Sequence, residues 1–110
     1  MTRKRLDVMK GTLTLMVLRA LEEGPRHGHE IMRWIRHRAD GAFQIEEGAI
    51  YPTLHRLKAK KLIRSEWGVS ENNRKAKYYQ LTPKGVERLR NEMSTWHRYV
   101  EAVADVIGSE

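Results

Sequence analysis

Apolar side chains recur at helical spacing in two stretches near the start of the chain. Between Asp7 and Glu22 they fall three and four residues apart, as on one face of a helix, and the Gly24-Pro25 pair ends that predicted helix. Its apolar positions, with the residue just before it, are Leu6, Met9, Leu13, Met16, Val17, Ala20 and Leu21. A second helix is predicted over residues 27–38. Its inward positions are Ile31, Trp34 and Ile35, and its outward positions are Arg33, Arg36 and Arg38.

A third helix is predicted from about Glu46 to Lys61. Its inner face is marked at steps of four and three residues by Ile50, Leu54 and Leu57. Pro52 lies inside this helix, where a proline removes one backbone hydrogen bond and presses on the carbonyl four residues earlier, that of Gly48. We therefore expect Pro52 to lie near the first turn of the helix.

After the third predicted helix, the spacing of apolar residues changes from a helical period to alternation with polar residues. Strands are predicted over residues 62–69 and 77–82, because apolar side chains alternate with polar ones in both. The apolar positions are Ile63, Trp67, Val69, Tyr79 and Leu81. Residues 70–75 between the strands are polar throughout and rich in turn formers. The pattern predicts a half-buried two-stranded wing.

The last predicted helix follows a narrower pattern. Thr82 can cap its start and Pro83 suits its first position. From there apolar residues alternate at steps of three and four, at Val86, Leu89, Met93, Trp96, Val100, Val103 and Ile107. This heptad spacing is typical of a coiled-coil seam. A helix over residues 83–107 would be roughly 37 Å long, longer than a small domain, so we expect a second copy of the chain to cover the seam. The alternative is packing across the first helix of the same chain, and we expect both together.

Charge sharpens the interpretation of the helix and wing. The chain has 110 residues, a formal net charge of +7 and 40% hydrophobic content, which fits one small domain. Residues 50–80 hold eight Lys/Arg and two Glu, so +8 − 2 = +6 of that charge lies there. A pI of about 10.0 favours an acidic partner such as nucleic acid. No apolar run approaches the roughly 20 residues of a membrane helix. The basic residues 1–5 do not read as a secretory signal, so we expect a cytoplasmic protein.

Composition argues against catalytic and metal chemistry. The chain has no cysteine, which excludes disulfides, thiol chemistry and Cys-based zinc fingers. His27 and His29 would point about 200° apart on a helix, with no cysteine to join them, and His55 and His97 have no nearby carboxylate at metal-ligand spacing. No catalytic triad, phosphate loop or paired carboxylates can be defended. We expect no cofactor, no metal and no enzymatic activity.

The third helix and the wing are the strongest candidates for a function. A helix fits the major groove of DNA, where side chains read base edges, while cations facing the backbone fix the register. A run of charges is more commonly a solvated face, but here helix, turn and wing carry the same sign. The candidate DNA contacts are Tyr51, Thr53, His55, Arg56 and Lys58 in the helix, and Arg74, Lys75 and Lys77 in the wing.

Four motifs together resemble the PadR family of bacterial transcription regulators, over nearly the whole chain. They are Gly11-Thr-Leu-Thr-Leu15, Gly24-Pro-Arg-His-Gly-His29, Gly48-Ala-Ile-Tyr-Pro-Thr-Leu-His-Arg-Leu57 and Arg74-Lys-Ala-Lys-Tyr-Tyr-Gln-Leu-Thr-Pro-Lys-Gly85. The stretch from Glu66 to Asn73, followed by Arg74, is closest to the subgroup called acidobacterial-type PadR regulators. A single C-terminal helix resembles the short PadR subfamily.

The resemblance implies an α+β, mainly α fold: a winged helix-turn-helix of three helices and a two-stranded wing over residues 1–82, with a C-terminal dimerisation helix over residues 83–110. It implies repression by operator binding as a homodimer, with Tyr51 contacting the DNA backbone. His29 stands where many members carry Tyr, and a DNA contact is carried over to it. A two-fold dimer places its recognition helices about one DNA turn apart, roughly 34 Å, so the target should be an inverted repeat.

Two alternatives stay open. Some short PadR-like regulators hold flat aromatic compounds with an aromatic residue of the C-terminal helix, which points to Trp96 as an effector site; the competing interpretation is a core tryptophan filling a heptad position. The competing function is a winged-helix module whose basic surface and coiled-coil helix bind an acidic partner protein.

Overall fold

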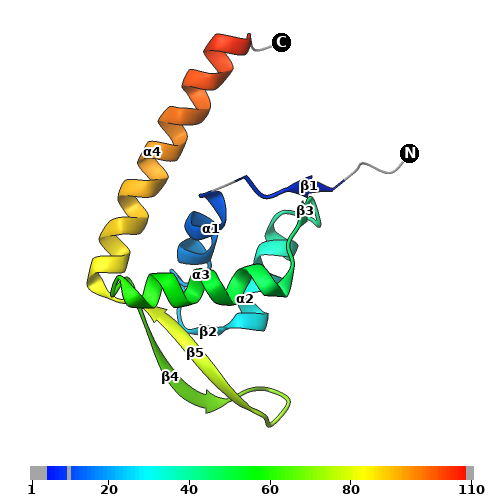
Figure 1. The fold of residues 1–110 in the computed structure, drawn as a ribbon, viewed down its shortest axis with the longest axis vertical. Coiled ribbons are helices and arrows are strands. Elements are labelled where there is room, and N and C mark those ends of the chain that lie inside the picture. The colour runs from blue at the N-terminus through cyan, green and yellow to red at the C-terminus, as the bar shows by residue number, and fades with distance from the viewer. Residues whose placement is uncertain (1–4, 10, 109–110) are drawn as a thin grey trace.

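The computed structural model describes residues 5–9 and 11–108 (Figure 1). Its elements, in chain order, are β1 (Leu6–Asp7), α1 (Thr12–Ala20), β2 (Arg26–His27), α2 (Gly28–Arg38), β3 (Phe43–Gln44), α3 (Glu47–Ala59), β4 (Ile63–Val69), β5 (Lys75–Leu81) and α4 (Pro83–Ile107). Lys10, inside the first predicted helix, and residues 1–4 and 109–110, at the ends of the two predicted units, lie outside the described residues. The fold is α+β and mainly α, as predicted.

The first helix is shorter than the sequence pattern indicated. It begins at Thr12, not Asp7, because Gly11 at its N-cap has φ 90°, a left-handed conformation that breaks the helical path and suits glycine. Upstream of the break, β1 pairs in parallel with β3. Leu6 and Met9 are 57% and 63% exposed, so their helical spacing was not a sign of a buried helix face.

The second helix begins with a reciprocal cap. Glu30 N–H donates to His27 Nδ1 at 3.2 Å, and His27 N–H donates to Glu30 Oε1 at 3.1 Å. The same His27 ends β2, which pairs antiparallel with β5. This histidine is therefore part of the fold, and the capping box explains why α2 starts at Gly28.

Pro52 lies in the second turn of the third helix, later than the expected position near the first turn. The backbone donor that proline lacks would have been directed at Gly48, which is the second residue of α3. The expected start at Glu46 is confirmed to within one residue, since Glu46 is the N-cap.

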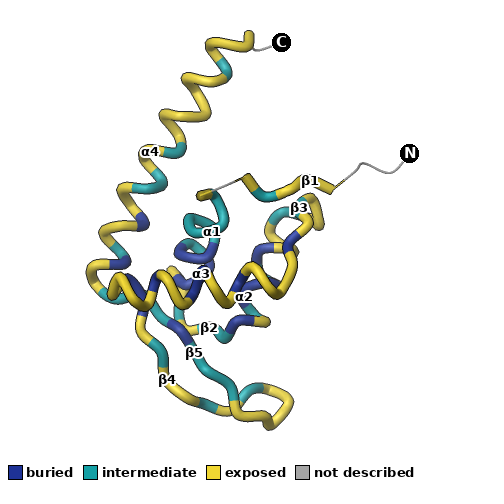
Figure 2. The backbone as a smooth tube through the Cα atoms, in the orientation of Figure 1, coloured by how far each residue is buried: buried dark blue, intermediate teal, exposed yellow. Residues whose placement is uncertain are grey.

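The sheet contains one strand more than the predicted wing. β4 and β5 pair antiparallel from Ile63↔Leu81 to Val69↔Lys75, and β2 joins the other edge of β5, giving the order β2-β5-β4. The prediction of a half-buried strand is wrong for the outer part of β4, where Trp67 is 59% and Val69 66% exposed. The alternation continues past the point where the sheet leaves the body of the protein (Figure 2).

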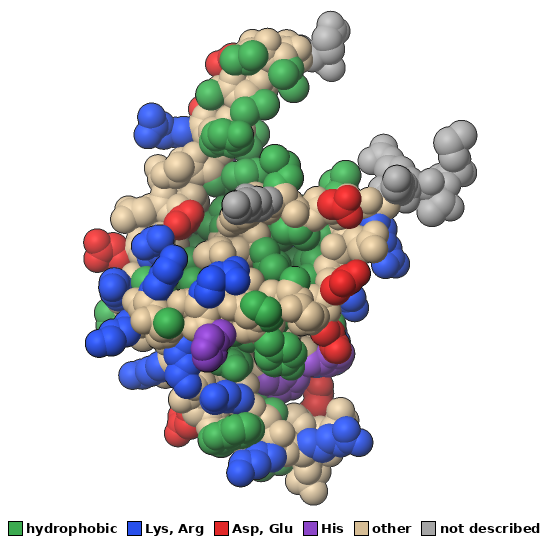
Figure 3. Space-filling model, in the orientation of Figure 1, with side chains coloured by type: hydrophobic (Ala, Val, Ile, Leu, Met, Phe, Trp, Pro, Cys, Tyr) green, Lys and Arg blue, Asp and Glu red, His purple; other side chains and the backbone are tan. Residues whose placement is uncertain are grey.

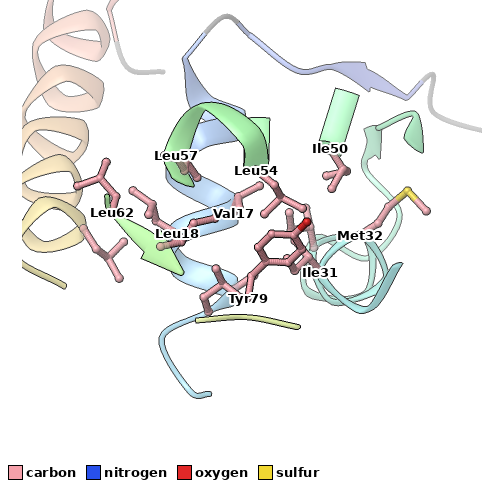
Figure 4. Packing of buried hydrophobic residues seen from close by; sticks show 14 of the residues in the cluster. Val17, Leu18, Ile31, Met32, Ile50, Leu54, Leu57, Leu62 and Tyr79 are labelled. Carbon is pink, nitrogen blue, oxygen red and sulfur yellow. The ribbon is translucent and has the colours of Figure 1, made fainter. Parts of the chain in front are cut away.

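The core lies where α1, α2 and α3 meet above the base of the sheet. In Figure 4, side chains of these helices point toward one another, with Tyr79 of β5 against them. The buried hydrophobic residues are Val17, Leu18, Ala20, Leu21, Ile31, Met32, Ile35, Ile45, Ile50, Leu54, Leu57, Leu62, Ile63, Tyr79 and Leu89. Burial of this apolar surface is the main favourable contribution to folding and holds α3 beside the wing.

The fourth helix belongs to the body only in its first half. Thr82 Oγ1 accepts the Gly85 N–H at 3.0 Å and donates to the Lys61 carbonyl at 2.7 Å, which fixes the start of α4. Leu89 is 0% exposed because it packs in the core of its own chain; its assignment to the dimer seam is therefore corrected. The second half of the helix extends away from the body (Figure 1), and Val100, Val103 and Ile107 are 43%, 38% and 76% exposed.

Candidate nucleic-acid interface

Two neighbouring grooves run between the start of α2, the outer face of α3 and the inner face of the wing. Their volumes are ≈ 600 Å³ and ≈ 480 Å³, and Tyr51, Lys77 and Tyr79 line both. Figure 3 shows lysine and arginine side chains gathered over α3 and the wing on this side of the molecule. We call this surface, from α3 across to the wing, the basic face.

Tyr51 lies at the centre of the basic face, where it lines both grooves. Its side chain is 53% exposed and lies on Gly28 at the start of α2. A Cβ on Gly28 would come within 2.9 Å of the Tyr51 ring and hydroxyl, so the ring would have to shift if position 28 carried a side chain. Sequence reasoning missed this packing of the glycine of the His-Gly pair, because only the tertiary structure brings it under Tyr51.

Thr53 is not on the basic face. It is 2% exposed, and its hydroxyl donates to the Ala49 carbonyl at 3.0 Å. It also accepts a hydrogen bond from Arg56 Nη2 at 3.2 Å. The predicted DNA contact is therefore corrected: Thr53 follows Ile50 by three residues and shares its buried side of α3. Its contact with the basic face is the hydrogen bond that it accepts from the Arg56 guanidinium.

The other predicted helix residues lie at the surface. His55, Arg56 and Lys58 are exposed along α3. His29 is also exposed, with Nδ1 3.4 Å from Glu47 Oε1, and it lines the larger groove with Tyr51. The structure thus brings residues of α2 and α3 to one surface.

The wing presents its cations on the same side. Arg74 and Lys75 are exposed and Lys77 is half-buried, and all three line the larger groove. The tight turn is closed by the Ser70 N–H, which donates to the Arg74 carbonyl at 2.7 Å. Across the groove, Arg33 Nη2 of α2 lies 2.9 Å from Glu71 Oε1, so an ion pair connects the wing turn to the body.

Two lysines from different elements share the smaller groove. The ammonium of Lys77 on β5, followed by desolvation, lowers the pKa of Lys58 on α3 below its ordinary value of 10.5. An anion between the two ammonium groups would relieve their repulsion. Nearby, burial and then the neighbouring Tyr51 raise the pKa of Tyr79 above 10.0, so its hydroxyl stays protonated.

Trp67 is the second residue that sequence reasoning missed. It was predicted to be half-buried, yet it is exposed beside Tyr51 in the larger groove, with Lys75 Nζ 5.0 Å and Lys77 Nζ 5.6 Å from its ring centroid. The +6 charge of residues 50–80 was visible in the sequence. The register that sets Trp67 opposite Lys77 was not.

Trp96 lies on α4 and lines neither groove of the basic face. Its ring stacks on Tyr99 with centroids 6.3 Å apart, and it lines an apolar pocket of ≈ 310 Å³ together with Trp34 and Met93. The pocket lies between α1, α2 and α4. Arg19, Arg26 and Arg38 surround the Trp34 ring at 5.5, 5.6 and 5.1 Å, and Trp34 itself is half-buried.

Two other features, a metal centre and a membrane span, are missing from the described part of the chain. Among residues 5–9 and 11–108, no group of three or more His, Cys, Asp or Glu side chains is placed to hold a metal ion. None of the helices in these residues combines the length and apolar character needed to cross a membrane.

The helices, the wing and the basic face define a winged helix-turn-helix protein. The sequence model of the transcriptional regulator PadR-like family matches residues 17–91, and the chain belongs to this family. Its members regulate transcription and are not enzymes. A transcriptional regulator from Clostridium thermocellum superposes with a TM-score of 0.81 at 26% identity, over 90% of this chain and 96% of that one.

Two further structures are informative. A PadR-like transcriptional regulator from Bacillus cereus has a TM-score of 0.77 at 29% identity, over 92% of this chain and 96% of its own. PadR of Bacillus subtilis, whose structure is a complex with operator DNA, has a TM-score of 0.68 over 78% of this chain and 48% of that one. At 21% identity the second likeness shows a shared fold alone.

Proposed function

We propose that this PadR-family regulator is a cytoplasmic repressor that binds an inverted-repeat operator as a homodimer. The observation that carries the proposal is the convergence of α3 and the wing on one basic face around Tyr51. The proposed DNA contacts are His29, Tyr51, His55, Arg56, Lys58, Arg74, Lys75 and Lys77. Phosphate contacts from the wing would fix the register, and α3 would read base edges in the major groove.

The dimer in this proposal is supported by the second half of α4, which extends beyond the body of the chain. Val86, Met93 and Trp96 are half-buried, and Val100, Val103 and Ile107 are exposed along a helix that extends beyond the body. A second copy of the same helix, related by a two-fold axis, would cover these residues. The DNA-binding unit of residues 1–82 would then be paired through residues 83–110, and the inverted repeat follows from that symmetry.

Replacing Tyr51 with phenylalanine tests the DNA contact. We expect specific affinity for a duplex from the promoter of the chain's own gene to fall on the order of tenfold, the loss of about one hydrogen bond to a charged group. Tyr99→Phe is a matched control, because Tyr99 is 56% and Tyr51 53% exposed but Tyr99 lies on α4. The measurement is fluorescence anisotropy over a salt series. The slope of log affinity against log salt concentration should be about −0.9 for each phosphate that the protein neutralises.

The proposed repressor would be in serious doubt if the wild-type protein showed no preference for its promoter over random duplex. Binding of an acidic protein by the basic face would then become the better proposal. A purified chain that sediments as a monomer would point the same way.

We also propose that a planar aromatic effector bound against Trp96 relieves repression. Support comes from the apolar pocket that Trp96 lines with Trp34 and Met93. Because this pocket adjoins α4, an occupant could change the spacing of the two DNA-binding units. We expect planar aromatic compounds to quench tryptophan fluorescence in the wild type and in Trp67→Phe, but not in Trp96→Ala. Absence of quenching across a broad panel would remove the effector from the proposal.

A further inference from the structure

The outer part of the wing exposes a large aromatic side chain toward the basic face. Alternate residues of β4 lie on one side of the sheet, so Trp67 shares the side of Ile63, which is 2% exposed and packs in the core. Trp67 itself is 59% exposed. The outer part of β4 and β5 extends away from the helices (Figure 2). The inward side of the strand therefore becomes a wall of the larger groove rather than part of the core.

Two cations are held beside the exposed ring. Lys77 stands directly opposite Trp67 in the strand register, and its Nζ lies 5.6 Å from the ring centroid. Lys75 Nζ lies 5.0 Å from the same centroid. Both distances are within the roughly 6 Å range of cation–π attraction. The indole thus keeps two ammonium groups next to an apolar surface.

The charge of the groove limits what can fill it. Its lining contains Arg33, Arg74, Lys75 and Lys77 against Glu71, so its formal charge is +4 − 1 = +3 with the histidines neutral. The carboxylate of Glu71 is paired with Arg33 at 2.9 Å. A suitable occupant offers carbon-rich faces with negative charges on both sides. The sugar-phosphate backbone of DNA has this alternation, with deoxyriboses between successive phosphates.

We propose that Trp67 is a DNA-contacting residue of the wing, whose indole packs on a deoxyribose of the backbone while Lys75 and Lys77 contact the flanking phosphates. This inference rests on the proposed DNA-binding function. The contact carries no base information, since sugars and phosphates are the same at every step. It adds affinity for operator and for random duplex by the same factor.

Trp67→Ala is therefore expected to raise the dissociation constant for both promoter and random duplex on the order of tenfold, within the range of aromatic contacts to nucleic acid. Trp67→Phe keeps a ring and should recover most of the loss. The salt slope of Trp67→Ala should equal that of the wild type, because no charge is removed, whereas Lys77→Met should reduce the slope by about 0.9. If Trp67 had only a structural role, Trp67→Ala would lower the melting temperature of the protein and leave its affinity for DNA unchanged.

The ring can also be observed directly. The protein has three tryptophans, so labelling with 5-fluorotryptophan gives one fluorine signal for each, and Trp67→Phe identifies the signal of Trp67. We expect that signal to shift when a duplex is added at saturating concentration. An unshifted Trp67 signal, or equal dissociation constants for wild type and Trp67→Ala, overturns the inference. If the wild type binds neither duplex, the DNA-binding function itself has failed.

Discussion

Gly85→Ala is expected to lower the free energy of unfolding by about 3 kcal/mol or more, at the upper end for overpacking substitutions. Gly85 is buried in the first turn of α4, and a Cβ there would overlap the carbonyl oxygen of Leu62 and lie 3.0 Å from its carbonyl carbon. The Leu62 carbonyl is backbone and accepts the Thr82 N–H at 3.1 Å, so it has little freedom to move. The overlap could be relieved only by moving the start of α4 away from Leu62.

Gly48→Ala is the matched control for this substitution. Gly48 lies inside α3 and is exposed, and a Cβ there would meet no neighbouring group within 4 Å, so alanine should raise stability by about 0.5 to 1 kcal/mol. Urea denaturation followed by circular dichroism at fixed protein concentration measures both variants. Equal midpoints for Gly85→Ala and the wild type would show that the start of α4 moves freely, contrary to the close packing of Gly85 on Leu62.

The same contact connects stability with DNA binding. Gly85 lets α4 begin directly against the end of the third helix and the first residue pairs of the wing, because Thr82 bonds Lys61 and Leu62 at that corner. The direction in which α4 leaves the body is set at this corner. In a dimer, that direction determines the separation of the two basic faces. Gly85→Ala should therefore weaken operator binding more than binding to a half-site.

Much of the architecture could be predicted from the sequence because it depends on local signals. The start of α4 follows from the Thr82 cap and Pro83, and α3 and the paired strands follow from the period of their apolar residues. The first helix was misjudged because a single residue, Gly11, takes a left-handed conformation that apolar spacing does not report. Periodicity records which side chains are apolar, not where the backbone turns.

The candidate interface was predictable in composition but not in detail. Basic residues of α3 and the wing stand out by charge alone, whereas the buried position of Thr53 depends on which side of α3 faces the core. Gly28 matters only because the Tyr51 ring lies on it, from a different helix. Leu89 and Val103 occupy equivalent heptad positions, yet one is in the core and the other exposed, because the body ends between them.

Val103→Glu is expected to raise the dimer dissociation constant at least about 100-fold. Val103 is 38% exposed in the single chain, so a glutamate there can remain hydrated and the folded monomer should lose little stability. In the proposed dimer the two-fold axis places a carboxylate from each copy in an apolar seam, where the effective penalty is several kcal/mol per unpaired ion. Ala102→Glu adds the same charge one position earlier, on the exposed outer side of α4, and should leave the dimer intact.

The loss of the dimer should carry over to DNA. Two linked binding units gain on the order of 10² to 10⁴ in affinity over one, provided both reach their half-sites. We therefore expect Val103→Glu to lose at least about 100-fold in affinity for an inverted repeat while its affinity for a single half-site is unchanged. Sedimentation equilibrium and anisotropy on the two duplexes measure the two effects in the same samples. A Val103→Glu protein that sediments as a dimer would place the interface elsewhere, and a monomer that still binds the inverted repeat with wild-type affinity would separate DNA recognition from dimerisation.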